Sequence, residues 1–446
     1  MIASEHLALN PSLYAWSFRS WRDQMRAKSF VKEMKCARCG KQYEPSASHT
    51  RCLNNDDGRL DIFYNYESLR EVLTPDILSK RDRGVWKYRE LLPINDPRNI
   101  VSLGEGGTPL VLARRLGEKL GLTKLWLLDD TRNPTSSFKD RPMTVGVSKA
   151  VELGYDTLVS ASSGNAAAAL SAYSAKARLR CITFVPEMAS RGKLAQLTMY
   201  GAKVVRVRGP ESGEDPTVRM LKEVCDRYNW YPCPSFGPMN PYQAEGPKTM
   251  SYEIVEGLSW SIPDWVLAPV GAGGALAGNW KGYREFRQLG FINELPRMVA
   301  VQSTGCAPVV RAYEQGADPL KITPWERPDS VATGLMDPFP WDGDAALIAV
   351  RESNGTAVAV SDEMILEAQR LLAKTEGIFA EPSGVTALAG LNELFAVGDV
   401  DRSEAVVVEI TGAGLKDPEI AIRGMGEIPT IDASTKELER VLKAWI

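Results

Sequence analysis

The chain has 446 residues, enough for two or three domains that each bury a hydrophobic core. Hydrophobic residues make up 44% and charged residues 24% of it, as is typical of a soluble globular protein. The net charge of -3 gives no electrostatic reason to expect nucleic acid or an anionic membrane as a partner. No apolar run reaches the length of about 18 residues that a transmembrane helix needs.

The N-terminal residues and the cysteine content favour the cytoplasm. Residues 1–16 contain no basic segment followed by an apolar stretch, so we expect no secretory signal. The seven cysteines are an odd number without the spacing of a disulfide framework, which fits a reducing compartment. We therefore expect a cytoplasmic protein.

From Lys124 onward, short apolar segments alternate with helical ones. The predicted strands are residues 125–128, 157–162, 181–186, 203–209, 264–270, 298–303 and 405–411. The predicted helices include residues 138–153, 165–177, 193–201 and 217–228. This alternation predicts an α/β protein with parallel sheets covered by helices on both faces. The β-branched segments are too many for one compact sheet, so two sheets are expected.

In such folds ligands bind beyond the carboxyl ends of the strands, so the loops that follow strands are candidates. The stretch NPTSSFKD (133–140) places Lys139 at the start of a predicted helix. The helix dipole there disfavours a cation, depresses the pKa of the amine and suits a nucleophile. A surface lysine that merely follows a loop is the alternative for Lys139 taken alone.

The loop PVGAGGALAG (269–278) is rich in glycine and lies between a strand and a helix, where backbone N–H groups can approach a phosphate. A dinucleotide fold would need a third glycine where Leu276 stands, and a carboxylate where the next strand ends in Gln302 and Ser303. The loop therefore favours a compact cofactor with one phosphate over NAD. A tight structural turn is the alternative.

Three further loops carry polar groups in suitable places. Ser162, Ser163 and Gly164 close a strand before Asn165, which either caps the following helix or helps to hold a carboxylate and a phenolic oxygen. Thr411 ends another strand, where its neutral hydroxyl can face a ring nitrogen. The loop GEGGTPL (104–110) contains three glycines and a proline.

Taken in order, these stretches resemble the pyridoxal-phosphate enzymes of the tryptophan synthase β fold, and most of all the threonine synthase family. The shared motifs are GEGGTPL, NPTSSFKDR, SSGN, GAGGA, AEPSGVTALAGL and TGAGLKD. The resemblance covers residues 96–425. It implies two doubly wound open-sheet domains with pyridoxal 5'-phosphate between them, preceded by an N-terminal extension. The expected boundaries are an extension of 1–95, a large domain of 96–155 and 236–430, a small domain of 156–235, and a helical tail of 431–446.

The resemblance also implies roles for individual residues. Lys139 would be the catalytic residue and would hold the cofactor as a Schiff base; when freed, its amine would take the α-proton of the substrate. The implied cofactor contacts are Phe138, Asn165, Gly271, Ala272, Gly273, Gly274, Ala275 and Thr411. The implied substrate contacts are Thr108, Ser162, Ser163, Lys193 and Gln243.

The implied activity is that of a lyase or synthase acting on an L-amino acid with a β- or γ-leaving group. In threonine synthase, phosphate leaves from the γ-carbon of O-phosphohomoserine and water adds at the β-carbon. The substrate end departs from the family at Gln243, where an arginine usually helps to bind phosphate. Ala166 and Ala413 replace a usual threonine and histidine, whereas Lys193 matches.

These departures leave alternatives open. One is β-replacement on O-phosphoserine or an acylated serine, as in cysteate or cysteine synthesis. Another is a regulatory protein that binds pyridoxal phosphate without catalysis. For every enzymatic alternative we expect a small-molecule amino-acid substrate, a homodimer, and neither nucleic acid nor membrane as a partner.

The segment CARCG (36–40) resembles the zinc-ribbon knuckle of some threonine synthases. A second knuckle after Cys52 would need a cysteine where Asn55 stands. Because that ligand is missing, we expect a degenerate zinc-ribbon-like segment that folds without metal. The alternative is a zinc site in which His49 completes a tetrahedron with Cys36, Cys39 and Cys52.

Overall fold

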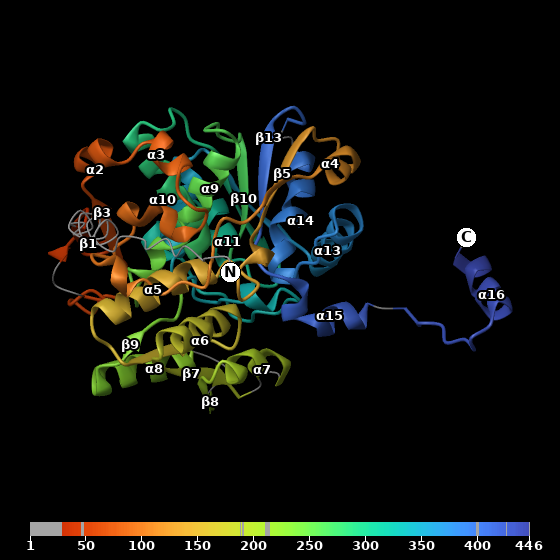
Figure 1. Cartoon of the computed structure of the whole chain (residues 1–446), viewed down its shortest axis with the longest axis horizontal. Helices are drawn as coiled ribbons and strands as arrows, with labels where there is room; N and C mark the ends of the chain where they lie inside the picture. Colours follow the sequence, from red (N-terminus) through yellow and green to blue (C-terminus); the bar gives the residue numbers. More distant parts are fainter. Residues whose placement is uncertain are drawn as a thin grey trace, which may run out of the picture.

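The computed structural model describes residues 29–45, 49–187, 189, 191–209, 215–397, 401–424 and 426–445, without the side chains of residues 191–193, 397 and 444. Its strands form three sheets, of three, six and four strands (Figure 1). The two larger sheets carry helices and confirm the predicted α/β architecture. The division of the chain at residues 95, 155, 235 and 430 stays a prediction.

The six-stranded sheet has the strand order β12-β11-β10-β13-β5-β4. Its strands are β4 (Leu110–Leu112), β5 (Lys124–Asp129), β10 (Trp265–Pro269), β11 (Arg297–Ser303), β12 (Thr356–Val360) and β13 (Ala405–Ile410). All neighbouring strands are parallel except the edge pair of β4 and β5, which is antiparallel. The predicted strands are parallel as expected; β4, which the sequence analysis did not list, adds an antiparallel edge, because its connection to β5 is too short for a crossover.

Helices cover both faces of this sheet. They are α4 (Arg114–Leu120), α9 (Thr249–Gly257), α10 (Gly274–Leu289), α11 (Pro308–Glu314), α12 (Gly343–Glu352), α13 (Asp362–Glu376) and α14 (Pro382–Val397). Because side chains alternate along a strand, Val266 and Ala268 of β10 join the core that contains Phe286 of α10. Leu267 of the same strand joins the opposite core, with Leu391 of α14. Burial on both sides explains why these strands are nearly continuous apolar runs.

The four-stranded sheet has the order β8-β7-β6-β9 and is parallel throughout. Its strands are β6 (Thr157–Ala161), β7 (Arg180–Pro186), β8 (Lys203–Val207) and β9 (Tyr231–Pro232). The nearby helices are α5 (Asp140–Glu152), α6 (Asn165–Ala177), α7 (Arg191–Met199) and α8 (Pro216–Tyr228). The predicted strands and helices of this region match these bounds to within two residues at every end, whereas the short strand β9 was not predicted.

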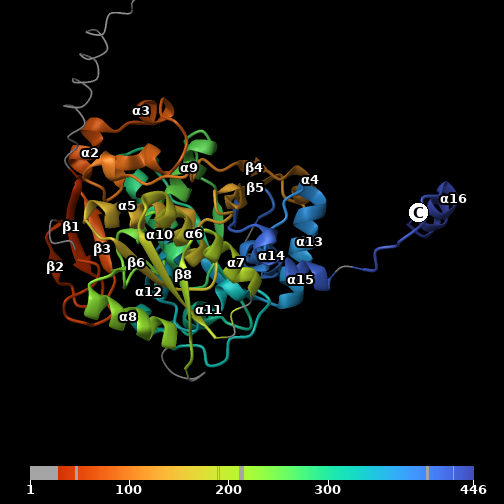
Figure 2. The ribbon, with the colours of Figure 1, turned by 60° about the horizontal axis from the view of Figure 1, so that its bottom comes forward.

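The N-terminal part forms a small antiparallel sheet beside the main body (Figure 2). It consists of β1 (Val31–Cys36), β2 (Gln42–Tyr43) and β3 (Leu60–Tyr64), followed by α2 (Tyr66–Val72) and α3 (Pro75–Ser79). At the other end, α15 (Pro418–Arg423) and α16 (Thr435–Trp445) lead away from the body (Figures 1 and 2). Among the described helices, none is long and apolar enough to cross a membrane.

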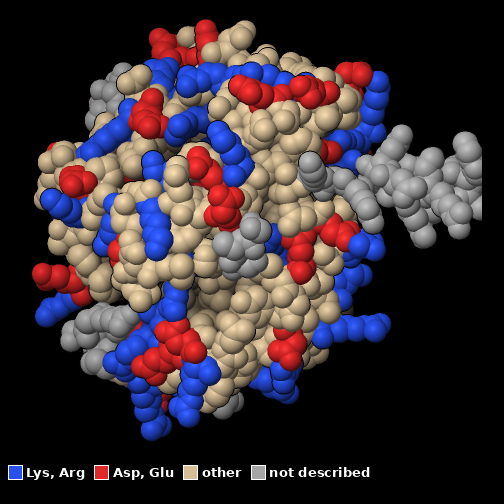
Figure 3. All heavy atoms as spheres, turned by 90° about the vertical axis from the view of Figure 1, so that its left-hand side faces the viewer, with Lys and Arg blue, Asp and Glu red and all other residues tan. Residues whose placement is uncertain are grey.

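Charged side chains of both signs are interspersed over the side that carries the N-terminal sheet (Figure 3).

Inside the molecule, one arginine joins several elements. Arg141 of α5 is fully buried and forms ion pairs of 2.7 Å with Asp130 and with Glu253 of α9. Its guanidinium also donates to the hydroxyls of Thr108 and Thr249, both at 3.0 Å. Arg141 thereby anchors the helix that follows Lys139.

Replacing Arg141 with methionine should lower the free energy of unfolding by about 3–5 kcal/mol, because two buried carboxylates would lose their cation. Arg180→Met is the matched control, since the Arg180–Asp156 pair lies at the surface with side chains 68% and 75% exposed. The control should leave stability nearly unchanged. Urea unfolding of both variants checks this, and equal losses for the two would contradict a structural role for Arg141.

Candidate active site

A cavity of about 600 Å³ lies where the carboxyl ends of strands from both larger sheets meet. Several residues predicted from the sequence line it, namely Phe138, Lys139, Ser162, Ser163, Asn165, Ala272 and Thr411. They come from the loops after β5, β6, β10 and β13. The structure therefore brings together loops that are far apart in the sequence.

The loop before Lys139 is held in place by hydrogen bonds of its backbone. The Thr135 N–H and hydroxyl donate to the buried Asp140 carboxylate at 2.7 and 2.8 Å. Ser136 has a positive φ of 65°, and the Phe138 N–H donates to the carbonyl of Thr411 at 2.8 Å. Helix α5 begins at Asp140 rather than at residue 138, so Lys139 is its N-cap residue.

The amine of Lys139 lies inside the cavity. Its Nζ donates to Ser235 Oγ at 2.7 Å and lies 4.6 Å from the centre of the Phe138 ring. Burial lowers the pKa of Lys139 from 10.5 to about 8, although the carboxylates of Asp342 and Asp337 oppose this shift. A useful fraction of the amine is therefore neutral near physiological pH, as a nucleophile requires.

Two carboxyl groups lie near this amine: Asp342 is buried, and Asp337 lines the cavity. Burial raises the pKa of Asp337 and that of Asp342 to about 7, while the charge of Lys139 lowers both. Asp342 also accepts hydrogen bonds from the Gly237 N–H at 2.9 and 3.1 Å. These groups keep a part of their protons near neutral pH and leave the amine only partly paired.

The glycine-rich loop runs from the end of β10 into the first turn of α10. Gly273 has a positive φ of 103°, and a Cβ atom there would lie 2.7 Å from the backbone oxygen of Asp342. Ala272 lines the large cavity, while Gly274 and Ala275 line an adjoining cavity of about 20 Å³ that Lys139 also touches. A helix N-terminus with closely approaching backbone is suited to holding a phosphate.

Gly271 lies against the backbone of Leu335. A Cβ atom added to it would lie 3.2 Å from Leu335 Cα, so the position has little room for a side chain. Neither Gly271 nor Gly273 belongs to the described lining of the two cavities. Their contribution to a phosphate site would be to shape the loop.

The start of α6 presents polar groups to the same cavity. Asn165 is the first residue of that helix, and its Nδ2 donates to Glu381 Oε1 at 2.5 Å. Ser162 Oγ accepts from the Gly164 N–H at 3.2 Å, and the Ser162 carbonyl accepts from Thr183 Oγ1 at 2.8 Å. These contacts fix the loop in the form of an anion site at a helix N-terminus.

Three predicted substrate contacts are not brought to the described lining of this cavity. Thr108 Oγ1 donates to Asp130 at 2.6 Å and accepts from Arg141. Gln243 is fully buried, where its amide donates to the Phe236 carbonyl at 3.1 Å and accepts from Cys233. Lys193 belongs to α7, but its side chain lies outside the described part of the chain.

The sequence analysis gave no role to several polar residues that line the cavity. Among them are Ser235, Asp337, Glu381, Ser383 and Lys416. Glu381, Ser383 and Lys416 stand within the motifs AEPSGVTALAGL and TGAGLKD, so the signal was present without an assigned role. Ser235 and Asp337 follow no recognisable motif.

Lys416 supplies a second cation to the cavity wall. Its Nζ donates to the Thr135 carbonyl at 2.9 Å and to Gln196 Oε1 at 2.7 Å. Burial lowers its pKa, an effect that the carboxylates of Glu381 and Asp140 oppose. Lys416 therefore links the NPTSSFKD loop to Gln196 of α7 beside the cavity.

Comparison with known proteins gives this arrangement a context. Residues 101–412 match the family model described as pyridoxal-phosphate dependent enzyme. The chain is 42% identical to a protein named threonine synthase from Methanocaldococcus jannaschii, over 92% of this chain and 99% of that protein. It is 40% identical to the protein of the same name from Methanosarcina acetivorans, over 92% and 98%.

Solved structures share the fold at lower identity. The structure of maize serine racemase aligns with a TM-score of 0.61 and 18% identity, over 75% of this chain and 93% of that one. The processed form of threonine deaminase isoform 2 from Solanum lycopersicum aligns with a TM-score of 0.58 and 20% identity, over 71% and 86%. These likenesses support the fold.

The residues of the cavity fit pyridoxal phosphate. A partly neutral amine is available for a covalent bond to an aldehyde, and a helix N-terminus lies beside it for a phosphate. The Asp342 carboxyl near Gly274 opposes a phosphate at this place. Because burial raises the pKa of Asp342 to about 7, its negative charge is reduced near neutral pH.

Gly273→Ala should weaken pyridoxal phosphate binding by about tenfold or more, equivalent to ~1.4 kcal/mol, because the methyl group would collide with the Asp342 backbone. Gly290→Ala at the other end of α10 is the control. Gly290 also has a positive φ, of 78°, but a Cβ atom there meets nothing within 4 Å.

Cofactor titration and thermal melting of both variants check this prediction. Each variant should lose some stability from backbone strain, and only Gly273→Ala should lose cofactor affinity. Unchanged affinity in Gly273→Ala would make the loop an ordinary turn.

Proposed function

Because this chain belongs to the family of pyridoxal-phosphate dependent enzymes, we propose that it converts O-phosphohomoserine and water to threonine and phosphate. The observation that carries the proposal is the 42% and 40% identity, over nearly the whole chain, to proteins named threonine synthase. The cavity around Lys139 supports it, because every loop needed for the cofactor meets there.

When bound, the cofactor withdraws electrons from the α-carbon of an amino-acid substrate, so that its α-proton becomes acidic. The protein has to supply a base for that proton. The amine of Lys139 is suited to this task, because burial lowers its pKa to about 8 and leaves it able both to accept and to return a proton. Ser235, at 2.7 Å from the amine, would orient it.

We assign the cofactor contacts to the loops around this amine. The N-terminus of α10, shaped by Gly271, Gly273 and Gly274, would hold the phosphate. Asn165, steered by Glu381 at 2.5 Å, would donate to the ring hydroxyl, and Thr411 would face the ring nitrogen. Phe138 packs against the amine of Lys139 and would border the ring.

The substrate would occupy the remainder of the cavity. Ser162 and Ser163 at the start of α6 would bind its carboxylate, which the helix dipole favours. Its phosphate would lie near Lys416, whose position on the cavity wall provides a cation from described residues. Lys193 on α7 remains a further proposed contact for the phosphate.

The alternative of β-replacement was considered because Gln243 stands where related synthases carry an arginine. Gln243 is fully buried and bonded to the Phe236 carbonyl and to Cys233, and it lines the small adjoining cavity beside Lys139 and Gly274 rather than the large one. Because both its amide oxygen and its amide nitrogen have protein partners, we propose that Gln243 does not contact the substrate directly, and the departure at this position alone does not favour the alternative. Thr108 likewise serves the Arg141 network in the structure, so we propose an indirect role for it.

We also propose that the enzyme works in the cytoplasm as a homodimer. All seven cysteines are free, in keeping with a reducing compartment. A homodimer is the commonest assembly among symmetric oligomers. Its substrate, on this proposal, is a small amino acid and no macromolecule.

Incubation of the holoenzyme with O-phosphohomoserine should release threonine and inorganic phosphate in equal amounts. O-phosphoserine and unphosphorylated homoserine serve as comparison substrates. Lys416→Met should lower kcat/KM for O-phosphohomoserine roughly 10- to 100-fold, as expected for loss of a charge-assisted hydrogen bond. Lys374→Met, at an exposed position on α13, is the control and should match the unmodified enzyme.

The comparison substrates decide between the alternatives. Turnover of O-phosphoserine in preference to O-phosphohomoserine would favour β-replacement. Cofactor binding without turnover of either substrate would favour a regulatory protein. Both results would contradict the proposed reaction.

A further inference from the structure

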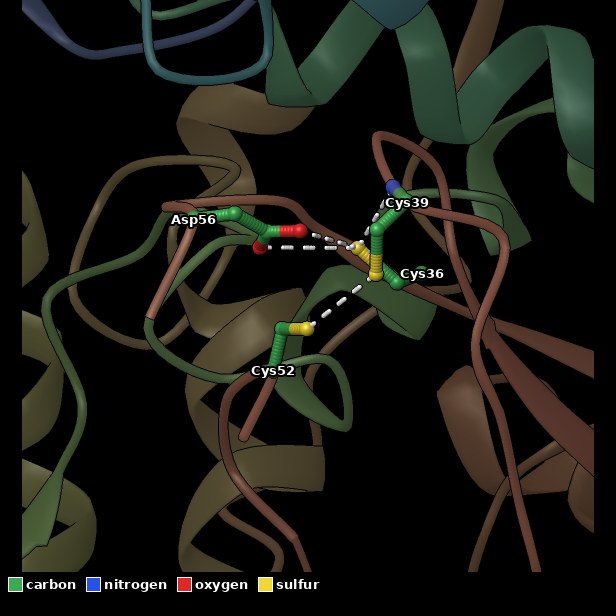
Figure 4. A group of neighbouring side chains, drawn as sticks. All are labelled: Cys36, Cys39, Cys52 and Asp56. Atoms are coloured by element: carbon green, nitrogen blue, oxygen red, sulfur yellow. Dashed lines mark hydrogen bonds between the residues drawn. The ribbon is translucent and has the colours of Figure 1, made fainter. Parts of the chain in front are cut away.

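A cluster of three thiols and one carboxylate lies in the small N-terminal sheet, far along the chain from the catalytic loops (Figure 4). Cys36 ends β1, Cys39 follows in the turn, and Cys52 and Asp56 belong to the loop that leads into β3. The ligand atoms of these four residues all lie within 4.8 Å of one another. The cluster plays no part in the reaction proposed above.

The distances in the cluster are those of a tetrahedral metal site. Cys39 Sγ and Cys52 Sγ are 3.6 Å apart, and Cys36 Sγ lies 3.5 and 3.6 Å from the two carboxylate oxygens of Asp56. With Zn–S bonds of about 2.3 Å and Zn–O bonds of about 2.0 Å, the edges of a tetrahedron are about 3.8 Å between sulfurs and about 3.5 Å between sulfur and oxygen. The four groups surround a space of the right size for one zinc ion.

Neighbouring groups form hydrogen bonds to the sulfur atoms, as residues around the ligands of a metal site do. The Cys39 N–H donates to Cys36 Sγ at 3.5 Å, and Asn54 Nδ2 donates to Cys39 Sγ at 3.3 Å. Tyr43 Oη lies 3.2 Å from Cys52 Sγ. Such outer contacts fix the direction of metal ligands and tune their affinity.

The loop backbone is also shaped for this arrangement. Asn55 and Asp57, on either side of Asp56, both have positive φ angles, of 50° and 51°. The Gly58 N–H donates to Asp56 Oδ1 at 2.9 Å, and a Cβ atom at Gly58 would lie 2.4 Å from Cys36 Sγ. The turn therefore delivers the carboxylate one residue beyond the place where a second knuckle would carry a cysteine.

We propose that Cys36, Cys39, Cys52 and Asp56 bind one Zn²⁺ ion. Three thiolates with one carboxylate suit zinc, and four protein ligands close the site to substrate, so the ion is structural. The sequence analysis expected no metal because Asn55 left a ligand missing; Asp56 provides the ligand that this expectation lacked. His49, the alternative fourth ligand, is described but lies outside the group, with its ring against Tyr43 at 5.0 Å.

The ion would stabilise the attachment of this sheet to the rest of the protein. The loop between Cys52 and β3 reaches α8 through the Asp57–Lys222 ion pair of 3.3 Å. Arg59, directly after the loop, pairs with Asp344 of α12 at 2.6 Å, with its side chain only 10% exposed. Loss of zinc should therefore loosen contacts that link the N-terminal sheet to two other parts of the fold.

The test uses the full chain, which is purified in reducing buffer, desalted and then exposed briefly to a chelator. After this brief exposure, metal analysis should find about one zinc ion per chain. Asp56→Ala should raise the zinc dissociation constant by at least about 100-fold, since changes to outer-shell partners alone cost roughly 10- to 100-fold. His49→Ala is the matched control and should bind zinc as the unmodified protein does.

Asp56→Cys guards against a variant that merely fails to fold, because it restores four ligands and should retain zinc. Cobalt loading should then give the strong visible absorption of tetrahedral thiolate coordination. The wavelength of this absorption should differ between the unmodified protein and Asp56→Cys. Failure of the folded, reduced protein to take up zinc would overturn the proposal. Loss of zinc in His49→Ala with retention in Asp56→Ala would equally overturn it.

Discussion

The structure depends on holding one lysine amine in a partly desolvated position where two sheets meet. An ammonium group in such a place loses solvation, and the result is a pKa of about 8 for Lys139 in place of 10.5. The surrounding groups reduce this cost without removing it: Ser235 accepts one hydrogen bond, and the carboxyls of Asp337 and Asp342, whose pKa values are raised to about 7, carry only part of a negative charge. An amine in this state can act both as nucleophile and as base.

Hydrogen bonds hold the neighbouring loops in place around this amine. The NPTSSFKD loop is tied to the carboxyl end of β13 by the Phe138–Thr411 bond, and Asp140 holds Thr135 within the loop. The N-terminal sheet reaches the same region through Arg59, whose charge lowers the pKa of Asp342 against the effect of burial. A change in the small sheet can therefore affect the environment of the amine at a distance.

Much of the fold could be predicted from the sequence, because buried parallel strands such as residues 298–303 are apolar runs bounded by turn residues. Motifs located Lys139 and Asn165 because their spacing is imposed by the strand-to-loop geometry. The direction of a side chain depends on tertiary packing, which no motif records. Gln243 therefore proved to be buried beside the small adjoining cavity rather than exposed to the large one, and Asp56 became visible as a ligand only once the turn was folded.

The central claim is that Lys139 carries the cofactor, and covalent trapping tests it most directly. Borohydride reduction of the yellow holoenzyme, followed by peptide mapping, should place the pyridoxyl group on Lys139. Lys139→Ala, with a melting temperature close to that of the unmodified protein, should carry none. Attachment to Lys416, the other described lysine that lines the cavity, or to any lysine elsewhere would contradict the account.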